Sequence, residues 1–200
     1  MTNERSQEPA GRWNFGVLAA ALTLGLLSAC GTPTQSLTMA LTPADSLQLR
    51  SWVPDGLKGN VELEGVKGGE VTGRWWGSKV TSLALSQALE DSLRGVGMLP
   101  MAPVPGARYQ LRVQLLSLDQ PLVAADTTVT VAIQYSLMAK GDGAVLYQRA
   151  VRTAATAGLS DALLSPTERL RLANEAAVRA NIAVAVRDLL SVKLPESAGR

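Results

Sequence analysis

The chain holds few of the side chains that enzymes use for covalent or acid–base chemistry. None of its 200 residues is a histidine, and Cys30 is its single cysteine. Histidine is the usual general base of Ser-His-Asp and Cys-His mechanisms and the commonest protein ligand of metals. We therefore expect no catalytic residue of these kinds, no metal site and no cofactor, and we expect that the protein is not an enzyme.

Three other kinds of site were considered: a nucleotide- or phosphate-binding loop, a serine–lysine pair, and a group of carboxylates. The glycines between residues 56 and 73 contain neither a dinucleotide-binding fingerprint nor a phosphate-binding loop. A serine paired with Lys79 or Lys140 stays open, because any serine of the chain could meet these lysines in space. No carboxylates cluster at the spacing of metal ligands. Four aspartates are interpreted as turn residues, since aspartate favours turns. They are Asp119, Asp126, Asp142 and Asp161.

The surroundings of Cys30 indicate lipid attachment. An uncharged apolar run of 13 residues, Phe15 to Leu27, follows a charged and polar start, and it is shorter than the roughly 20 residues that span a bilayer as a helix. Residues 1–29 therefore have the pattern of an export signal. Leu27-Ser28-Ala29-Cys30 resembles the lipobox of bacterial lipoproteins, which implies cleavage before Cys30 and acyl chains on it. An ordinary secretory signal and a short uncleaved anchor are the alternatives.

The residues around the cysteine also suggest a location. Gly31 stands where a signal for retention in the inner membrane would place aspartate. By resemblance to sorted lipoproteins we expect the outer membrane, on its periplasmic face, with the inner membrane as the alternative. One cysteine permits no disulfide within the chain, so the core must hold the domain together. A net charge of +2 gives no reason to expect a nucleic-acid partner.

Two groups of residues could contact a partner. Trp75 and Trp76 lie between glycines and could form a recognition surface, although one ring could instead close the end of the core. Successive residues of an extended chain point to opposite sides, so we expect one ring to be packed and the other accessible. Arg169, Arg171 and Arg179 could meet anionic lipid or peptidoglycan, or could simply be solvated.

The first half of the chain predicts mixed structure. Residues 30–44, rich in Thr, Ser and Pro, are typical of a flexible tether between lipid and domain. A short strand is predicted from Ser46 to Val53. Residues 54–73 are interpreted as a hairpin or loose loop around Val61-Glu-Leu63-Glu. Apolar spacing predicts a helix from Lys79 to Arg94, with Ser78 as its N-cap.

The second half predicts three strands and a helix. Residues 109–115 and 128–137 alternate apolar and polar side chains, and a third strand, 145–154, follows a hairpin turn at 140–143, giving an antiparallel meander. Ser165-Pro166-Thr167-Glu168 predicts the start of the last helix. Its apolar stripe comprises Leu170, Ala173, Ala177, Val178, Ile182, Ala185, Val186 and Leu189. The charged residues are expected mostly off this stripe, with Glu175 and Arg179 able to pair across one turn.

These elements predict an α+β fold. Two helices and a mostly antiparallel sheet, in the order β-α-β-β-β-α, form a two-layer sandwich with both helices on one face of the sheet. We expect one domain over residues 45–194, followed by a disordered tail at 195–200.

Several positions resemble a group of small Gram-negative envelope lipoproteins, largely uncharacterised and sometimes labelled sugar-nucleotide acyltransferases. The matching features are Ser78-x-Val80, Ala88-Leu89-x-x-Ser92-Leu93-x-x-x-Gly97, the strand from Tyr109 ending in Asp119-Gln120-Pro121, Tyr135, and Glu175-Ala-Ala-x-Arg179-x-Asn181-Ile182. The group usually has phenylalanine near Leu85, where this chain departs from it. The architecture is also similar to accessory lipoproteins of transporters and curli secretion.

The resemblance implies a role in the envelope. We expect a non-catalytic, membrane-anchored lipoprotein whose periplasmic domain binds an envelope protein or glycolipid partner in assembly or transport. The alternative is an acyltransferase or hydrolase of envelope glycolipids. An enzyme would show a pocket with converging polar groups, whereas a binding module would show an apolar patch or an unpaired sheet edge.

Overall fold

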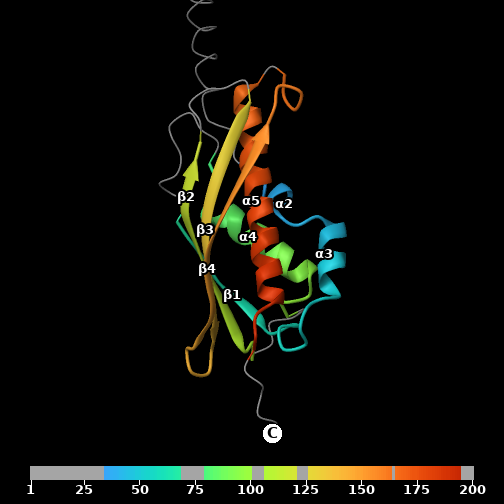
Figure 1. Cartoon of the computed structure of the whole chain (residues 1–200), viewed down its shortest axis with the longest axis vertical. Helices are drawn as coiled ribbons and strands as arrows, with labels where there is room; N and C mark the ends of the chain where they lie inside the picture. Colours follow the sequence, from blue (N-terminus) through green and yellow to red (C-terminus); the bar gives the residue numbers. More distant parts are fainter. Residues whose placement is uncertain (1–33, 69–78, 101–105, 121–125, 164, 195–200) are drawn as a thin grey trace, which may run out of the picture. The chain divides into compact units, whose positions relative to one another are not determined.

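The computed structural model describes residues 34–68, 79–100, 106–120, 126–163 and 165–194. The chain divides into two units, Met1–Cys30 and Gly31–Arg200, and the described residues all belong to the second. This unit has the α+β fold that the sequence predicts, with helices on one side of a sheet (Figure 1).

The sheet has four strands in the order β1-β2-β3-β4 (Figure 1). They are β1 Val61–Lys67, β2 Tyr109–Asp119, β3 Thr127–Ala139 and β4 Val145–Ala157. The last three form the predicted antiparallel meander, and β1 is added parallel to β2. In the hairpin between β3 and β4, Gly143 has a φ of 73°, the positive value that its predicted turn requires.

The strands form a sheet because their apolar residues recur at every second position. In β3 the inward residues Val129, Val131, Ile133, Tyr135 and Leu137 are fully buried. The intervening residues face the other side of the sheet, where they stay partly or fully exposed. Burying one face against the helices thus fixes the register of the meander.

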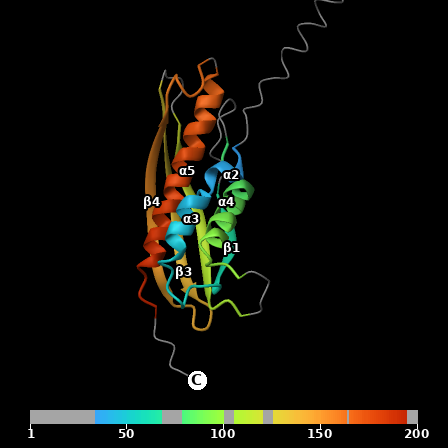
Figure 2. The ribbon, with the colours of Figure 1, turned by 90° about the vertical axis from the view of Figure 1, so that its right-hand side faces the viewer.

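The described residues form four helices on the buried side of the sheet, of which α4 and α5 pack directly on it, while α2 and α3 lie outside these two (Figures 1 and 2). The four helices are α2 Ser36–Met39, α3 Pro43–Arg50, α4 Ser82–Gly95 and α5 Pro166–Leu190. The longest, α5, begins as predicted, because the Ser165 hydroxyl accepts the backbone N–H of Glu168 at 3.2 Å. All eight residues of its predicted apolar stripe are buried.

The predicted strand from Ser46 to Val53 is wrong. This segment belongs to α3, which begins at Pro43 and is capped by Thr42, whose hydroxyl accepts the backbone N–H of Asp45 at 3.1 Å. Ser46 is the one buried residue of α3, and Leu47 is 67% exposed, so the segment contributes little to the core. The first strand lies instead at Val61–Lys67, in the segment interpreted as a hairpin or loop.

The first predicted helix starts later than expected. The hydroxyl of Thr81 accepts the backbone N–H of Ala84 at 3.1 Å, so α4 begins at Ser82 and not at Lys79. Ser78, the predicted N-cap, lies outside the described residues. The helix ends at Gly95, and Gly97 has a φ of 82°, consistent with the predicted stop.

The interpretation of residues 30–44 as a flexible tether is wrong for its described part, residues 34–44. Met39 is fully buried and Leu41 is 7% exposed, and α2 packs beside α4 and α5 (Figure 2). The few charges and many Thr and Ser residues of this segment suggested a tether. In the structure its apolar residues enter the core, and the hydroxyl of Thr42 caps α3. The folded unit therefore begins at least ten residues earlier than predicted.

Candidate functional site

The segment that precedes α3 is held to the rest of the unit by polar contacts. The hydroxyl of Thr34 donates to the carbonyl of Lys79 at 3.0 Å, and the backbone N–H of Gln35 donates to Glu175 Oε1 at 2.8 Å. Farther along, the N–H of Leu41 donates to Ser92 Oγ at 3.0 Å. The chain is therefore fixed in place from Thr34 onward, against both α4 and α5.

A charged cluster on α5 provides one of these attachment points. Arg171 Nη1 donates to Glu175 Oε1 at 2.6 Å, while its Nε donates to Glu168 Oε2 at 2.9 Å. Glu175 is 2% exposed and Arg171 is 9% exposed, so the pair is removed from water. The hydrogen bond from Arg171 holds the pKa of the Glu168 carboxyl below its usual value. The guanidinium of Arg171 thus bonds to two carboxylates, and one of these, Glu175, also accepts the backbone N–H of Gln35.

A second attachment point uses the other end of α2. The Nε of Arg179 donates to the carbonyl of Thr38 at 2.7 Å, and its Nη2 donates to the same oxygen. This oxygen lies near the C-terminal end of α2, where basic side chains commonly bond to the last carbonyls of a helix. Arg179 therefore stabilises the position of α2.

The predictions for the charged residues of α5 are wrong in two respects. Glu175 pairs with Arg171, one turn before it, and not with Arg179. Arg169 and Arg171 are 5% and 9% exposed, so they are not solvated residues, and neither is available to anionic lipid or peptidoglycan. Periodicity placed them beside the apolar stripe but could not show that α2 and the loop before α5 would cover them. The carbonyl of Ala162, in that loop, accepts from Arg169 at 2.7 Å.

A second buried network lies deeper in the core. Tyr135 donates through its hydroxyl to Asn181 Oδ1 at 2.9 Å, and the Asn181 amide donates to the carbonyl of Val151 at 2.8 Å. Burial raises the pKa of the Tyr135 hydroxyl, so it stays protonated and serves as a hydrogen-bond donor. Tyr135, Glu175, Arg179 and Asn181 all belong to the resemblance drawn from the sequence. In the structure, each of these four connects secondary-structure elements.

A third polar group lies near the end of α5. Tyr147 and Arg149 both donate to Asp188 Oδ2 at 2.8 Å, which connects the start of β4 to the last turns of the helix. Burial and the hydrogen bond to Asp188 raise the pKa of the Tyr147 hydroxyl. This arrangement therefore anchors β4 to α5.

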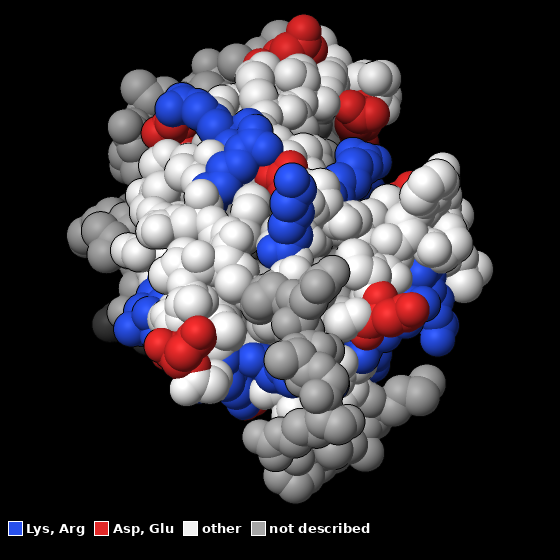
Figure 3. All heavy atoms as spheres, turned by 60° about the horizontal axis from the view of Figure 1, so that its bottom comes forward, with Lys and Arg blue, Asp and Glu red and all other residues white. Residues whose placement is uncertain are grey.

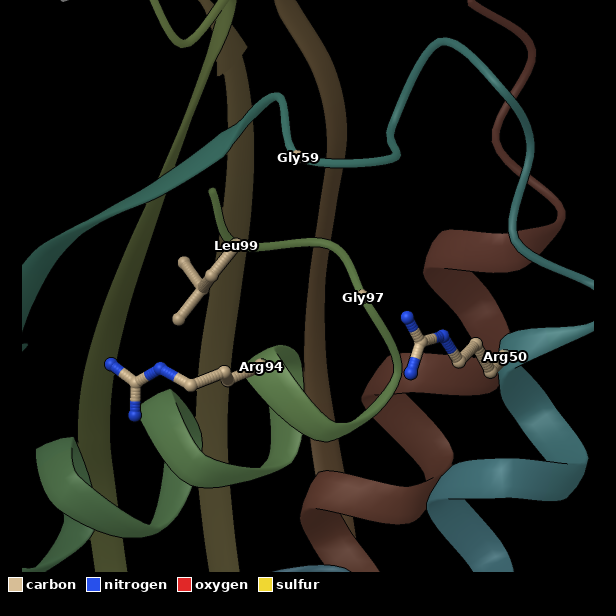
Figure 4. Close-up of a pocket in the computed structure, with 5 residues that line it drawn as sticks. All are labelled: Arg50, Gly59, Arg94, Gly97 and Leu99. Carbon is tan, nitrogen blue, oxygen red and sulfur yellow. The ribbon is translucent and has the colours of Figure 1, made fainter. Parts of the chain in front are cut away.

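A hollow of about 390 Å³ lies where α3 and α4 end, lined by Arg50, Gly59, Arg94, Gly97 and Leu99. Its two guanidinium groups do not converge: in Figure 4, Arg50 and Arg94 lie on opposite sides of the loop that carries Gly97 and Leu99. Arg94 pairs along its own helix with Asp91 at 3.4 Å. Figure 3 shows the lower face of the molecule with basic and acidic side chains interspersed. The hollow therefore lacks the convergent polar groups of a catalytic pocket.

Several of the other residues considered for chemistry have structural partners. Lys140 pairs with Glu62, whereas Lys79 has an exposed side chain and contacts Thr34 only through its backbone carbonyl. Asp142 and Asp161 accept backbone N–H groups two and three residues away, as expected of aspartates in turns. Asp119 pairs with Arg152. Within the described ranges, no three Asp, Glu, His or Cys side chains lie close enough to hold a metal ion.

The residues predicted for lipidation and partner binding cannot be located. Cys30, Trp75 and Trp76 lie outside the described residues, so their roles stay predictions. Among the helices of the described part, none is long and apolar enough to cross a membrane. Two exposed leucines near Thr34, Leu37 and Leu83, were not predicted from the sequence. The tether interpretation concealed the contact of Thr34 with Lys79, which brings the segment before α2 to the start of α4.

No protein-family model matches the chain, and no curated protein matches it. Solved structures with a similar fold include a candidate lipoprotein of Caulobacter crescentus, at 15% identity over 72% of this chain and 93% of that one, with a TM-score of 0.47. A Xanthomonas campestris protein is 15% identical over 56% and 62%, with a TM-score of 0.46. A hypothetical protein of Chlamydia trachomatis is 11% identical over 67% and 98%, with a TM-score of 0.43. With TM-scores below 0.5, these similarities assign neither a family nor a function.

Proposed function

We propose that the protein is a lipoprotein, acylated on Cys30, whose non-catalytic domain binds an envelope partner in assembly or transport. The sequence Leu27-Ser28-Ala29-Cys30 after a short apolar run carries the first part of the proposal. Several acyl chains would supply the anchor, since each buried methylene contributes about 0.8 kcal/mol. We place the anchor in the outer membrane, on its periplasmic face, because Gly31 follows the cysteine.

The pairing of the buried polar residues supports a binding role over a catalytic one. Glu175, Arg171 and Arg179 use their charges to hold α2, and Asn181 uses its amide to hold β4. A catalytic group has to present a polar atom to the substrate. The polar atoms of these four side chains bond to neighbouring elements of the same fold, so they stabilise the domain. A partner would therefore be bound by other residues, on the surface.

Mass spectrometry of the mature protein purified from membranes tests the anchor. We expect a chain that begins at Cys30 and carries lipid, and we expect Cys30→Ser to remain unprocessed and unacylated. An intact Met1 or a free thiol on Cys30 in the wild type would overturn the proposal. Because Cys30 is the only cysteine, no second thiol can complicate the result.

Enzyme assays test the non-catalytic role. The purified acylated protein is incubated with ester and acyl-donor substrates, and we expect no turnover. Lys79→Ala and Lys140→Ala separate true turnover from contamination, because a serine–lysine mechanism would need one of these lysines. Turnover that either substitution abolishes would replace the binding role with the alternative, an acyltransferase or hydrolase.

The partner surface is proposed to include Trp75 or Trp76. Membrane proteins captured with the acylated wild type are compared with those captured by Trp75→Ala and Trp76→Ala. We expect one substitution to lower the melting temperature and the other to weaken capture without affecting melting. Trp52→Ala is the matched control, since Trp52 is a 72% exposed tryptophan that follows α3. Equal loss of stability at Trp75 and Trp76 would remove both from the partner surface.

A further inference from the structure

The connection between the proposed lipid and the folded domain is short. Thr34 is 8% exposed and is bonded to Lys79, and only Gly31, Thr32 and Pro33 separate it from Cys30. Four residue-to-residue steps of fully extended chain span at most about 14 Å. If Cys30 carries the acyl chains in the bilayer, Thr34 must lie within that distance of the membrane surface.

Two exposed leucines lie close to Thr34. Leu37 is 77% exposed on α2, while the neighbouring Met39 points into the core. Leu83 is 69% exposed on α4, four residues after the carbonyl that Thr34 contacts. The two helices lie beside each other in Figure 2, and the contact of Leu41 with Ser92 shows that they run in the same direction. Both leucines therefore face solvent within reach of the lipid.

Two exposed lysines border the same region. Lys79 directly contacts Thr34 through its carbonyl. Lys67 ends β1, next to Gly68, whose carbonyl accepts a hydrogen bond from Ser82 at the start of α4. Glu64, the carboxylate near Lys67, is already paired with Arg112 at 2.7 Å. Basic side chains beside apolar ones are typical of surfaces that lie against anionic lipid.

We infer that the surface formed by Leu37, Leu83, Lys67 and Lys79 rests on the bilayer that holds the acylated Cys30, so the domain has a fixed orientation on the membrane. This inference depends on the proposed lipidation. Single exposed leucines are common on protein surfaces and carry no meaning alone. The short connection distinguishes these two, because it holds them at the bilayer, where apolar side chains enter the interface and lysines meet the headgroups.

Site-specific fluorescence quenching tests the orientation. With Cys30 blocked by lipid, Leu37→Cys and Leu83→Cys each introduce the only free thiol, which is labelled with a fluorophore. Val145→Cys is the matched control, because Val145 is apolar and 54% exposed but begins β4, directly after the β3–β4 hairpin, which lies below α2 and the other helices in Figures 1 and 2. The acylated proteins are reconstituted in vesicles of phosphatidylethanolamine and phosphatidylglycerol that contain brominated lipid.

We expect brominated lipid to quench the labels at positions 37 and 83 at least about fivefold more strongly than the label at position 145. The first two labels should lie at the membrane interface, whereas the third should stay in water. Equal quenching at all three positions, in protein that floats with the vesicles and carries lipid on Cys30, would overturn the orientation but leave the lipidation intact. Quenching at position 145 alone would also overturn it. An unacylated Cys30 would overturn the proposed function and this inference together.

Discussion

The hydroxyl of Tyr135 lies 2.9 Å from Oδ1 of Asn181, in the centre of the core, where neither residue is exposed to solvent. The amide nitrogen of Asn181 donates to the carbonyl of Val151 and, at 3.0 Å, to the hydroxyl of Thr153. One side chain on α5 therefore connects β3 and β4. The strand β4 pairs with β3 alone in the sheet, and Asn181 adds a hydrogen bond that holds it to α5.

Replacing Asn181 should destabilise the domain strongly. Asn181→Leu keeps the approximate volume but removes, in the core, the acceptor of the Tyr135 hydroxyl and the donor to the Val151 carbonyl. We expect a loss of about 2–4 kcal/mol in the free energy of unfolding, measured from urea denaturation. Tyr135→Phe should cost less, about 1–2 kcal/mol, because Asn181 retains its other hydrogen bonds.

The matched control is an exposed polar pair on the same sheet. Arg152 contacts Asp119 at 3.2 Å with both side chains more than half exposed. Arg152→Ala should change the free energy of unfolding by less than about 0.5 kcal/mol. If Asn181→Leu were no more destabilising than this control, the buried network would not contribute to the stability of the fold.

A side chain at Gly68 should destabilise the end of β1. This glycine has a φ of 85°, and a Cβ atom placed on it would lie 2.4 Å from the backbone carbonyl oxygen of Leu115. Both the conformation and the contact exclude alanine, so Gly68→Ala should cost at least about 1–2 kcal/mol. Gly141→Ala is the control, since nothing lies within 4 Å of its Cβ position. Equal melting temperatures for the two variants would contradict this account.

The contribution of Glu168 to stability should depend on pH. Its pKa is lowered in the folded state by the hydrogen bond from Arg171, so the stabilisation is present above the ordinary glutamate pKa and is lost as the pH falls through the folded pKa. We expect Glu168→Gln to be less stable than the wild type near pH 7 and to approach it below about pH 4. Urea denaturation at several pH values measures this difference, and a difference that does not shrink on acidification would contradict the assignment.

The sequence predicted those elements whose signals are local. Ser165-Pro166-Thr167-Glu168 marked the start of α5 correctly because an N-cap needs only residues within one turn. The meander was predictable because alternation over residues 128–137 corresponds directly to one buried face. Gly143 similarly signalled its own turn.

Long-range packing explains the failures. Residues 34–44 resemble a tether in composition, yet Glu175, 140 positions later, accepts the N–H of Gln35. The same packing buries Arg171 and Glu175, which helical periodicity alone had left outside the apolar stripe. The segment from Ser46 to Val53 was predicted as a strand, whereas most of it belongs to α3, a short helix that contributes few residues to the core. The surface near Thr34 could be recognised only after these contacts were known.

Breaking the contact between Glu175 and Gln35 should release the segment that joins the domain to Cys30. Glu175→Ala removes the acceptor of the Gln35 N–H and leaves Arg171 buried with one carboxylate in place of two. We expect a loss of about 3–5 kcal/mol in the free energy of unfolding. We also expect faster amide hydrogen exchange from Gln35 to Leu41 than in the rest of the domain.

The exchange pattern distinguishes local release from general weakening. Glu90→Ala is the control, because Glu90 is a half-exposed glutamate on α4 that lies 4.0 Å from Arg94, and its loss should leave exchange of the N-terminal segment unchanged. In the vesicle experiment, Glu175→Ala should also reduce the difference in quenching between positions 83 and 145, because release of the segment lengthens the connection between α4 and the lipid. Uniformly faster exchange throughout the domain, with no excess between Gln35 and Leu41, would show that Glu175 stabilises α5 without fixing the chain that leads to the membrane.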